Sequence, residues 1–66
     1  MEVLALAGSH KKRHEARLAQ AMRWRDMFKR AEQMAERYGR PMLAIEYHQL
    51  AVDWSEKVEE ISASLR

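Results

Sequence analysis

Two histidines one helical turn apart are the side chains best spaced to share a metal ion. On a helix, the imidazoles of His10 and His14 would lie on one face, while the Glu15 carboxylate would point away from them. Positions 11–13 read Lys-Lys-Arg, and these three positive charges would repel a divalent cation. We therefore predict no metal site and no bound cofactor.

The other reactive side chains lack the arrangement that catalysis needs. The chain has no cysteine and no glycine-rich phosphate loop, and its serines have no base and orienting acid at helical spacing. Glu46 and His48 are two positions apart, so a helix would point them in different directions. We expect a protein that is not an enzyme and that has no small-molecule substrate.

Apolar residues recur at steps of three and four on both sides of a Gly39-Arg40-Pro41 break, which is the spacing of one stripe of an α-helix. The ladder before the break is Trp24, Met27, Ala31, Met34 and Tyr38, and the ladder after it is Ala44, Tyr47, Ala51, Trp54, Val58, Ile61 and Leu65. A three-residue connection is typical of antiparallel neighbours. The sequence therefore predicts an all-α fold, an antiparallel two-helix hairpin with helices at about 9–38 and 41–65.

The ends of the two helices carry local signals. Gly39 can adopt the left-handed conformation that closes a helix, and Pro41 suits the first turn of the next helix. Ser9 is a candidate N-cap for the first helix, although that helix could equally start earlier and tolerate Gly8. We divide the chain into a short apolar segment, 1–8, and a single helical-hairpin domain, 9–66.

The two ladders also predict a register. Pairing across the turn runs from a layer of Tyr38 and Ala44 out to a layer of Trp24 and Val58. Beyond that layer the second helix has no apolar partner on the first. The apolar run Val3–Ala7, folded back or supplied by a second chain, is the candidate cover for that end, along with Leu18 and Ala21 on a neighbouring stripe.

A chain of 66 residues buries only about 60% of the surface that its unfolded form exposes. With no disulfide and no structural zinc motif, oligomerisation is the remaining way to enlarge the core. Further apolar residues widen the buried face beyond one hairpin, and we expect them to form the core of a homodimeric four-helix bundle: Leu18, Met22, Phe28, Leu43 and Leu50. Ile45 and Val52 form a second, narrow strip, which is either dimer interface or a binding site for a different protein.

Charge is uneven along the chain, because residues 10–30 carry eight Lys or Arg against two acidic residues. This basic first helix could simply be a solvated face, or its charge could be met internally by Glu56, Glu59 and Glu60. It could instead bind an acidic protein or the phosphates of nucleic acid. The candidate nucleic-acid contacts are Lys11, Lys12, Arg13, Arg17, Arg23 and Lys29.

In its layout, a hairpin that closes into an antiparallel dimeric bundle, the chain resembles the plasmid repressor-of-primer proteins. That resemblance concerns architecture, and no functional residue is carried over from it. The longest apolar run is far below the roughly 20 residues that cross a bilayer, so we expect a cytoplasmic protein.

Three classes of function remain. We favour a small regulator, adaptor or inhibitor, of the kind that bacteria, phages and plasmids carry as small chains, that binds another protein through a coiled-coil-like dimeric surface. Its candidate contacts are Phe28, Ile45, Val52, Lys11, Lys12 and Arg13. The alternatives are an RNA- or DNA-binding dimer that uses the basic first helix, and a purely structural oligomerisation element.

Overall fold

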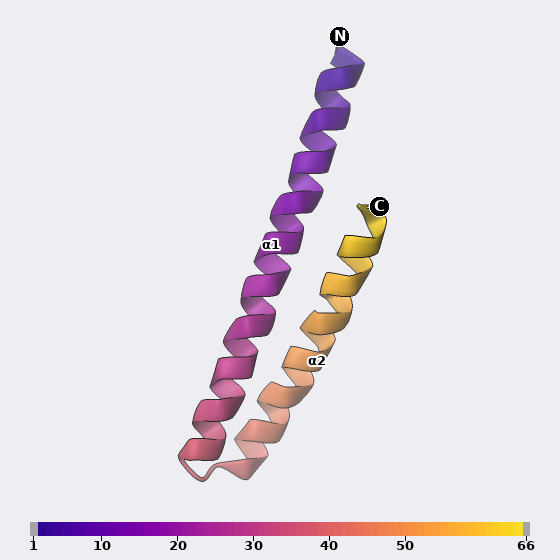
Figure 1. Ribbon diagram of the computed structural model, residues 1–66. Helices are drawn as coiled ribbons and strands as arrows, with labels where there is room; N and C mark the ends of the chain where they lie inside the picture. The colour runs from indigo at the N-terminus through magenta and orange to yellow at the C-terminus, as the bar shows by residue number, and fades with distance from the viewer. Residues whose placement is uncertain (1, 66) are drawn as a thin grey trace.

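Two antiparallel helices lie side by side and make up the described chain (Figure 1). A computed structural model describes the backbone of residues 2–65 and the side chains of residues 12–65. Helix α1 spans Glu2–Arg37 and helix α2 spans Pro41–Ser64, and residues 2–65 contain no strand. The molecule measures 57 × 15 × 12 Å, so it is a single layer two helices wide. The predicted all-α hairpin is confirmed.

The turn between the helices uses the residues that the sequence singled out. Gly39 has a φ of +69°, the left-handed conformation that ends a helix. The amide of Gly39 donates to the carbonyl of Glu36 (3.1 Å), and the amide of Arg40 donates to that of Ala35 (2.8 Å), as in a Schellman motif. Pro41 then occupies the first turn of α2, where its missing N–H is no loss. These contacts reverse the chain within three residues.

Helix α1 begins earlier than the expected start near Ser9. It runs without interruption from Glu2 through Gly8, so Ser9 is an interior residue and not an N-cap. One glycine costs a helix only about 1 kcal/mol relative to alanine, and strong helix formers such as Leu4 and Ala5 surround it. The first turns of α1 extend beyond the end of α2 (Figure 1), so Val3–Ala7 does not fold back over the hairpin.

Small side chains form the contact between the helices. The buried residues are Ala21, Ala35, Ala44, Ala51 and Ile61, and none of the described large side chains is completely buried. Alanine at the contact lets two helix backbones approach closely, with larger side chains to either side. All seven members of the ladder predicted for the second helix are buried or half-buried, so that stripe is confirmed.

The stripe predicted for the first helix is correct at Trp24, which stacks on Trp54 of α2, and at half-buried Ala31, but it is wrong at its three other members. Met27, Met34 and Tyr38 are exposed by 45%, 47% and 68%, whereas Ala21 and Ala35 are buried. The contact stripe of α1 therefore runs along the neighbouring line of the helix that passes through Ala21 and Ala35. The prediction followed the bulkiest apolar residues, but close helix packing selected the small ones.

Candidate protein-binding surfaces

The apolar ladder predicted for the first helix lies at the edge of its contact with α2 and forms part of a wide apolar surface. We call this surface the broad face, and its members are Trp24, Met27, Ala31, Met34, Tyr38, Leu43 and Leu50. Met34, Tyr38 and Leu43 line one groove across the two helices, which places both helices' apolar edges on the same side. Leu50 lies two helical turns from Leu43 on that side of α2 and is 38% exposed.

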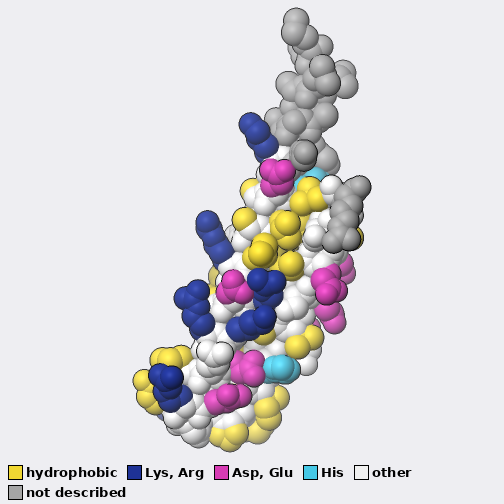
Figure 2. Space-filling model, in the orientation of Figure 1, with side chains coloured by type: hydrophobic (Ala, Val, Ile, Leu, Met, Phe, Trp, Pro, Cys, Tyr) yellow, Lys and Arg dark blue, Asp and Glu magenta, His cyan; other side chains and the backbone are white. Residues whose placement is uncertain are grey.

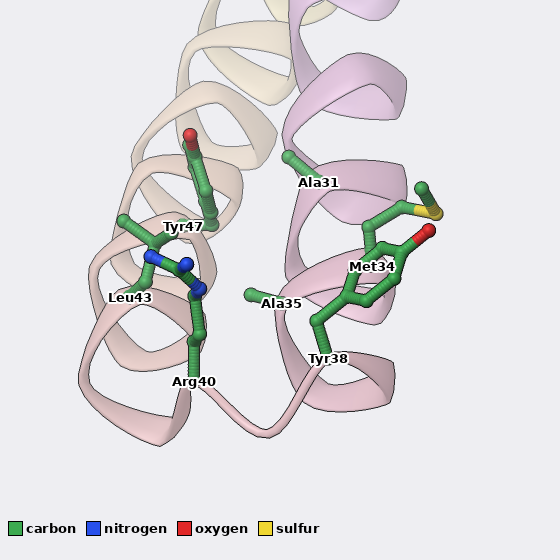
Figure 3. Close-up of a pocket in the computed structure, with 7 residues that line it drawn as sticks. All are labelled: Ala31, Met34, Ala35, Tyr38, Arg40, Leu43 and Tyr47. Carbon is green, nitrogen blue, oxygen red and sulfur yellow. The ribbon is translucent and has the colours of Figure 1, made fainter.

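An open groove crosses the broad face beside the turn (Figure 3). Met34 and Tyr38 of α1 stand on one side of it, Leu43 and Tyr47 of α2 stand on the other, and Arg40 lies at the turn. Its volume of about 450 Å³ is in the range of small-ligand sites, but it is a surface groove between half-exposed side chains. Such a groove suits the side chains of another helix better than an enclosed small molecule.

A row of stacked aromatic rings adjoins the broad face and shares Trp24 with it. Trp24 stacks on Phe28 with ring centroids 6.1 Å apart, and on Trp54 at 6.2 Å. Phe28 in turn stacks on Tyr47 at 6.2 Å. The four rings tie α1 to α2 at mid-height. Phe28, a candidate contact for a partner protein, is half-buried within this row.

The broad face becomes polar at the end away from the turn. There the groove between the helices is lined by Arg17, Gln20 and Lys57 together with Trp24, Trp54 and Ile61. Ile61 is only 8% exposed, which corrects the expectation that this part of α2 lacks cover. Apolar surface is therefore concentrated on the half of the hairpin nearer the turn.

The opposite side of the hairpin is polar. The His48 imidazole Nδ1 lies 3.1 Å and 3.2 Å from the two carboxylate oxygens of Glu32, joining α2 to α1. Lys29, Gln33 and Ser55 surround the pair. The contact between Glu32 and His48 was not predicted, because the predicted contact stripe of the first helix runs through other residues. The contact between Glu32 and His48 can be expected from the sequence only when the helix contact is known to run through Ala35 and Ala44.

A second apolar strip runs along α2 apart from the broad face. Met42, Ile45 and Val52 are exposed by 73%, 63% and 36%. Ile45 and Val52 are each two positions from Leu43 and Leu50, so about 200° of helix rotation separates the two sets. We call Met42, Ile45 and Val52 the narrow strip.

The five candidates for a dimer core do not share one surface. Leu43 and Leu50 belong to the broad face, and Phe28 belongs to the aromatic row beneath it. Leu18 is half-buried. Met22 is 40% exposed and stands two positions from Trp24, which turns it away from the broad face.

The candidate nucleic-acid contacts are spread around α1 and do not share one stripe. Of the nucleic-acid candidates, Lys12, Arg13, Arg17, Arg23 and Lys29 are exposed, and the side chain of Lys11 lies outside the described residues. Figure 2 shows dark blue Lys and Arg side chains along the outer edge of α1.

The expected ion pairs between the basic helix and the glutamates of α2 do not form within residues 12–65. Arg25 instead donates from Nε to its neighbour Asp26 (3.1 Å). Glu56, Glu59 and Glu60 are exposed, as are Arg17 and Arg23. Most of the charge of the described α1 therefore faces solvent.

Among the described side chains there is no group of three His, Cys, Asp or Glu that could hold a metal ion. His10, one of the two histidines considered as metal ligands, has its side chain outside the described residues. Within residues 2–65, neither helix has a stretch long and apolar enough to span a membrane. Comparison with known protein families, curated proteins and solved structures found no match.

Proposed function

We propose that this chain is a small, non-enzymatic regulatory or adaptor protein that binds another protein through a dimeric helical-hairpin surface. The observation that carries the proposal is the amount of exposed apolar surface: among residues 12–65, nine large apolar side chains are exposed by 36% to 73%. Contiguous apolar surface of this kind marks interaction sites in soluble proteins.

The two apolar surfaces suit different partners. The broad face continues the aromatic row of the hairpin core, and a second hairpin laid on it would complete a four-helix bundle. Ile45 and Val52 of the narrow strip lie about 200° around α2 from Leu43 and Leu50, so these two side chains would stay open in such a dimer. We assign self-association to the broad face and the other protein to the narrow strip.

The chemistry of the narrow strip fits the apolar side of a partner's helix. Met42 and Ile45 are three residues apart and Val52 is seven further on, which gives anchors at helical spacing. Methionine is flexible and adapts to differently shaped neighbours. Exposed Gln49 lies among these residues and gives the strip a polar rim.

A nucleic-acid binder is the second candidate, because Arg23, Arg30 and Arg37 form an exposed row at seven-residue spacing along α1. Arginines on one line of a helix can contact successive phosphates. This row is also a neighbour of the broad face, where it could meet acidic protein side chains.

Capture of a partner from host lysate tests the proposal. The double variant Ile45→Glu/Val52→Glu should lose the captured protein and keep its dimeric mass, because only the narrow strip is changed. The matched control Ala19→Glu/Ala63→Glu puts two charges on exposed positions outside both apolar surfaces and should capture as the unchanged chain does. Capture that survives the double variant would contradict the assignment, and loss of the dimer would move both residues into its core.

A further inference from the structure

Two rows of opposite charge flank the broad face, one on each helix. Arg23, Arg30 and Arg37 recur every seven residues on α1, and all three are exposed. Glu46, Asp53 and Glu60 recur every seven residues on α2, and they too are exposed. We call these the arginine row and the acidic row.

Helical geometry places both rows beside the broad face. Asp53 and Glu60 line a groove with Trp54, and Trp54 stacks on Trp24 of the broad face. Glu46 lies seven residues before Asp53, so it continues the same row toward the turn. On α1, Arg30 and Arg37 each follow a broad-face methionine, Met27 or Met34, by three residues. The broad face is therefore bordered by positive charge on one side and by negative charge on the other.

A second copy can cover such a face in two symmetric ways. A two-fold axis parallel to the helices places α1 of one copy over α2 of the other, with both turns at the same end. A two-fold axis across the helices places α1 over α1 and α2 over α2, with the turns at opposite ends. Only the first arrangement brings each arginine row against the other copy's acidic row; the second sets like charges against each other.

The distribution of apolar surface along the hairpin points the same way. The groove near the turn is lined mostly by apolar side chains such as Met34 and Leu43, whereas the groove at the far end includes Arg17 and Lys57. With both turns at the same end, apolar surface meets apolar surface. With the turns at opposite ends, Arg17 and Lys57 would lose water against an apolar groove, which is costly for unpaired charges.

The polar ends meet in the same-end arrangement too, and their charge is partly balanced there. Arg17 and Lys57 of both copies would approach one another, but the exposed acidic Glu56 and Glu60 stand on the same end of α2.

We infer that the broad face is closed by a second copy of this chain, with both Gly39 turns at the same end and the arginine row of each copy against the acidic row of the other. This inference rests on the proposed function, and it identifies a second copy of this chain as the partner of the broad face. The narrow strip plays no part in it, so failure of the dimer and failure of partner capture are separate results.

The distance between the two turns distinguishes the arrangements. The chain has no cysteine, so Arg40→Cys allows one spin label per copy at the turn. The same-end dimer places the labels within about 25 Å, since neighbouring helices in a bundle lie about 8–10 Å apart. The opposite-end dimer separates them by at least about 36 Å, the length of a 24-residue helix. The long distance, or no distance because the chain is monomeric, would overturn the inference.

Charge reversal provides an independent test. The variant Glu46→Arg/Asp53→Arg/Glu60→Arg sets arginine against arginine in the same-end dimer and should raise the dimer Kd by roughly tenfold or more, as each reversed pair occurs twice. Adding Arg23→Glu, Arg30→Glu and Arg37→Glu to that chain should restore the original Kd. An unchanged Kd for the first variant, or no recovery in a sixfold variant of unchanged helicity, would refute the pairing of rows.

Discussion

Trp24 of α1 and Trp54 of α2 stack with ring centroids 6.2 Å apart and ring planes 22° apart. The pair joins the helices at mid-height, yet Trp24 keeps 39% of its surface exposed. One ring thus belongs both to the hairpin core and to the broad face. This double position links the folding of one copy to the covering of its apolar surface.

Tryptophan fluorescence should therefore depend on protein concentration. As the chain passes from monomer to dimer, Trp24 loses contact with water, so acrylamide should quench the emission less strongly at high concentration. The variant Met34→Glu places a charge in the broad face and should keep quenching high at every concentration. Equal quenching of the unchanged chain across the whole range would contradict burial of this surface.

Enlarging a side chain at the helix contact should destabilise the hairpin. Ala51 is 4% exposed, so Ala51→Leu should lower the free energy of unfolding by about 1–3 kcal/mol through overpacking. Urea denaturation followed by circular dichroism gives the value. Ala63→Leu makes the same change at an exposed position of α2 and should stay within about 0.5 kcal/mol. Equal effects of the two substitutions on the free energy of unfolding would show that Ala51 does not lie at the helix contact.

The two glycines should respond oppositely to the same substitution. Gly39→Ala should destabilise by about 1 kcal/mol, because the φ of +69° is unfavourable for alanine although nothing lies within 4 Å of an added Cβ. Gly8 lies inside α1, so Gly8→Ala should stabilise that helix by about 0.5–1 kcal/mol. Thermal melts of both variants provide the check, and a stabilising Gly39→Ala would contradict the turn geometry.

The sequence was sufficient to predict the elements. Gly39 and Pro41 located the turn, and the ladder from Ala44 to Leu65 gave the buried side of α2. Both signals are local, since they depend on backbone conformation and on periodicity within one helix. The sequence left two starts open for α1, at Ser9 or before Gly8, because a single glycine is a weak signal in a run of helix formers.

The face of α1 that meets α2 could not be predicted in the same way. Two stripes competed, one bulky and one through Ala21 and Ala35, and apolar periodicity favours the bulky stripe. The choice depends on how closely two backbones approach, which is a property of the pair of helices. The same error hid the contact between Glu32 and His48 and the true position of the broad face.

Salt dependence separates protein binding from nucleic-acid binding. The arginine row has acidic side chains as its proposed partner, so duplex RNA or DNA should bind weakly to the dimer at physiological salt. Titration with labelled duplexes at several salt concentrations measures both the affinity and the number of phosphate contacts. Tight binding with a steep salt slope, lost in Arg23→Glu/Arg30→Glu, would favour the nucleic-acid function instead.

The mass of the full chain in solution tests the central claim most directly, because a single hairpin leaves the broad face exposed. Sedimentation equilibrium at micromolar concentration should give a dimer, twice the 7.8 kDa of one chain. The Met34→Glu variant should shift that mass toward the monomer while both chains remain helical. A stable, cooperatively unfolding monomer of 7.8 kDa would contradict the account, since the broad face would then need no partner.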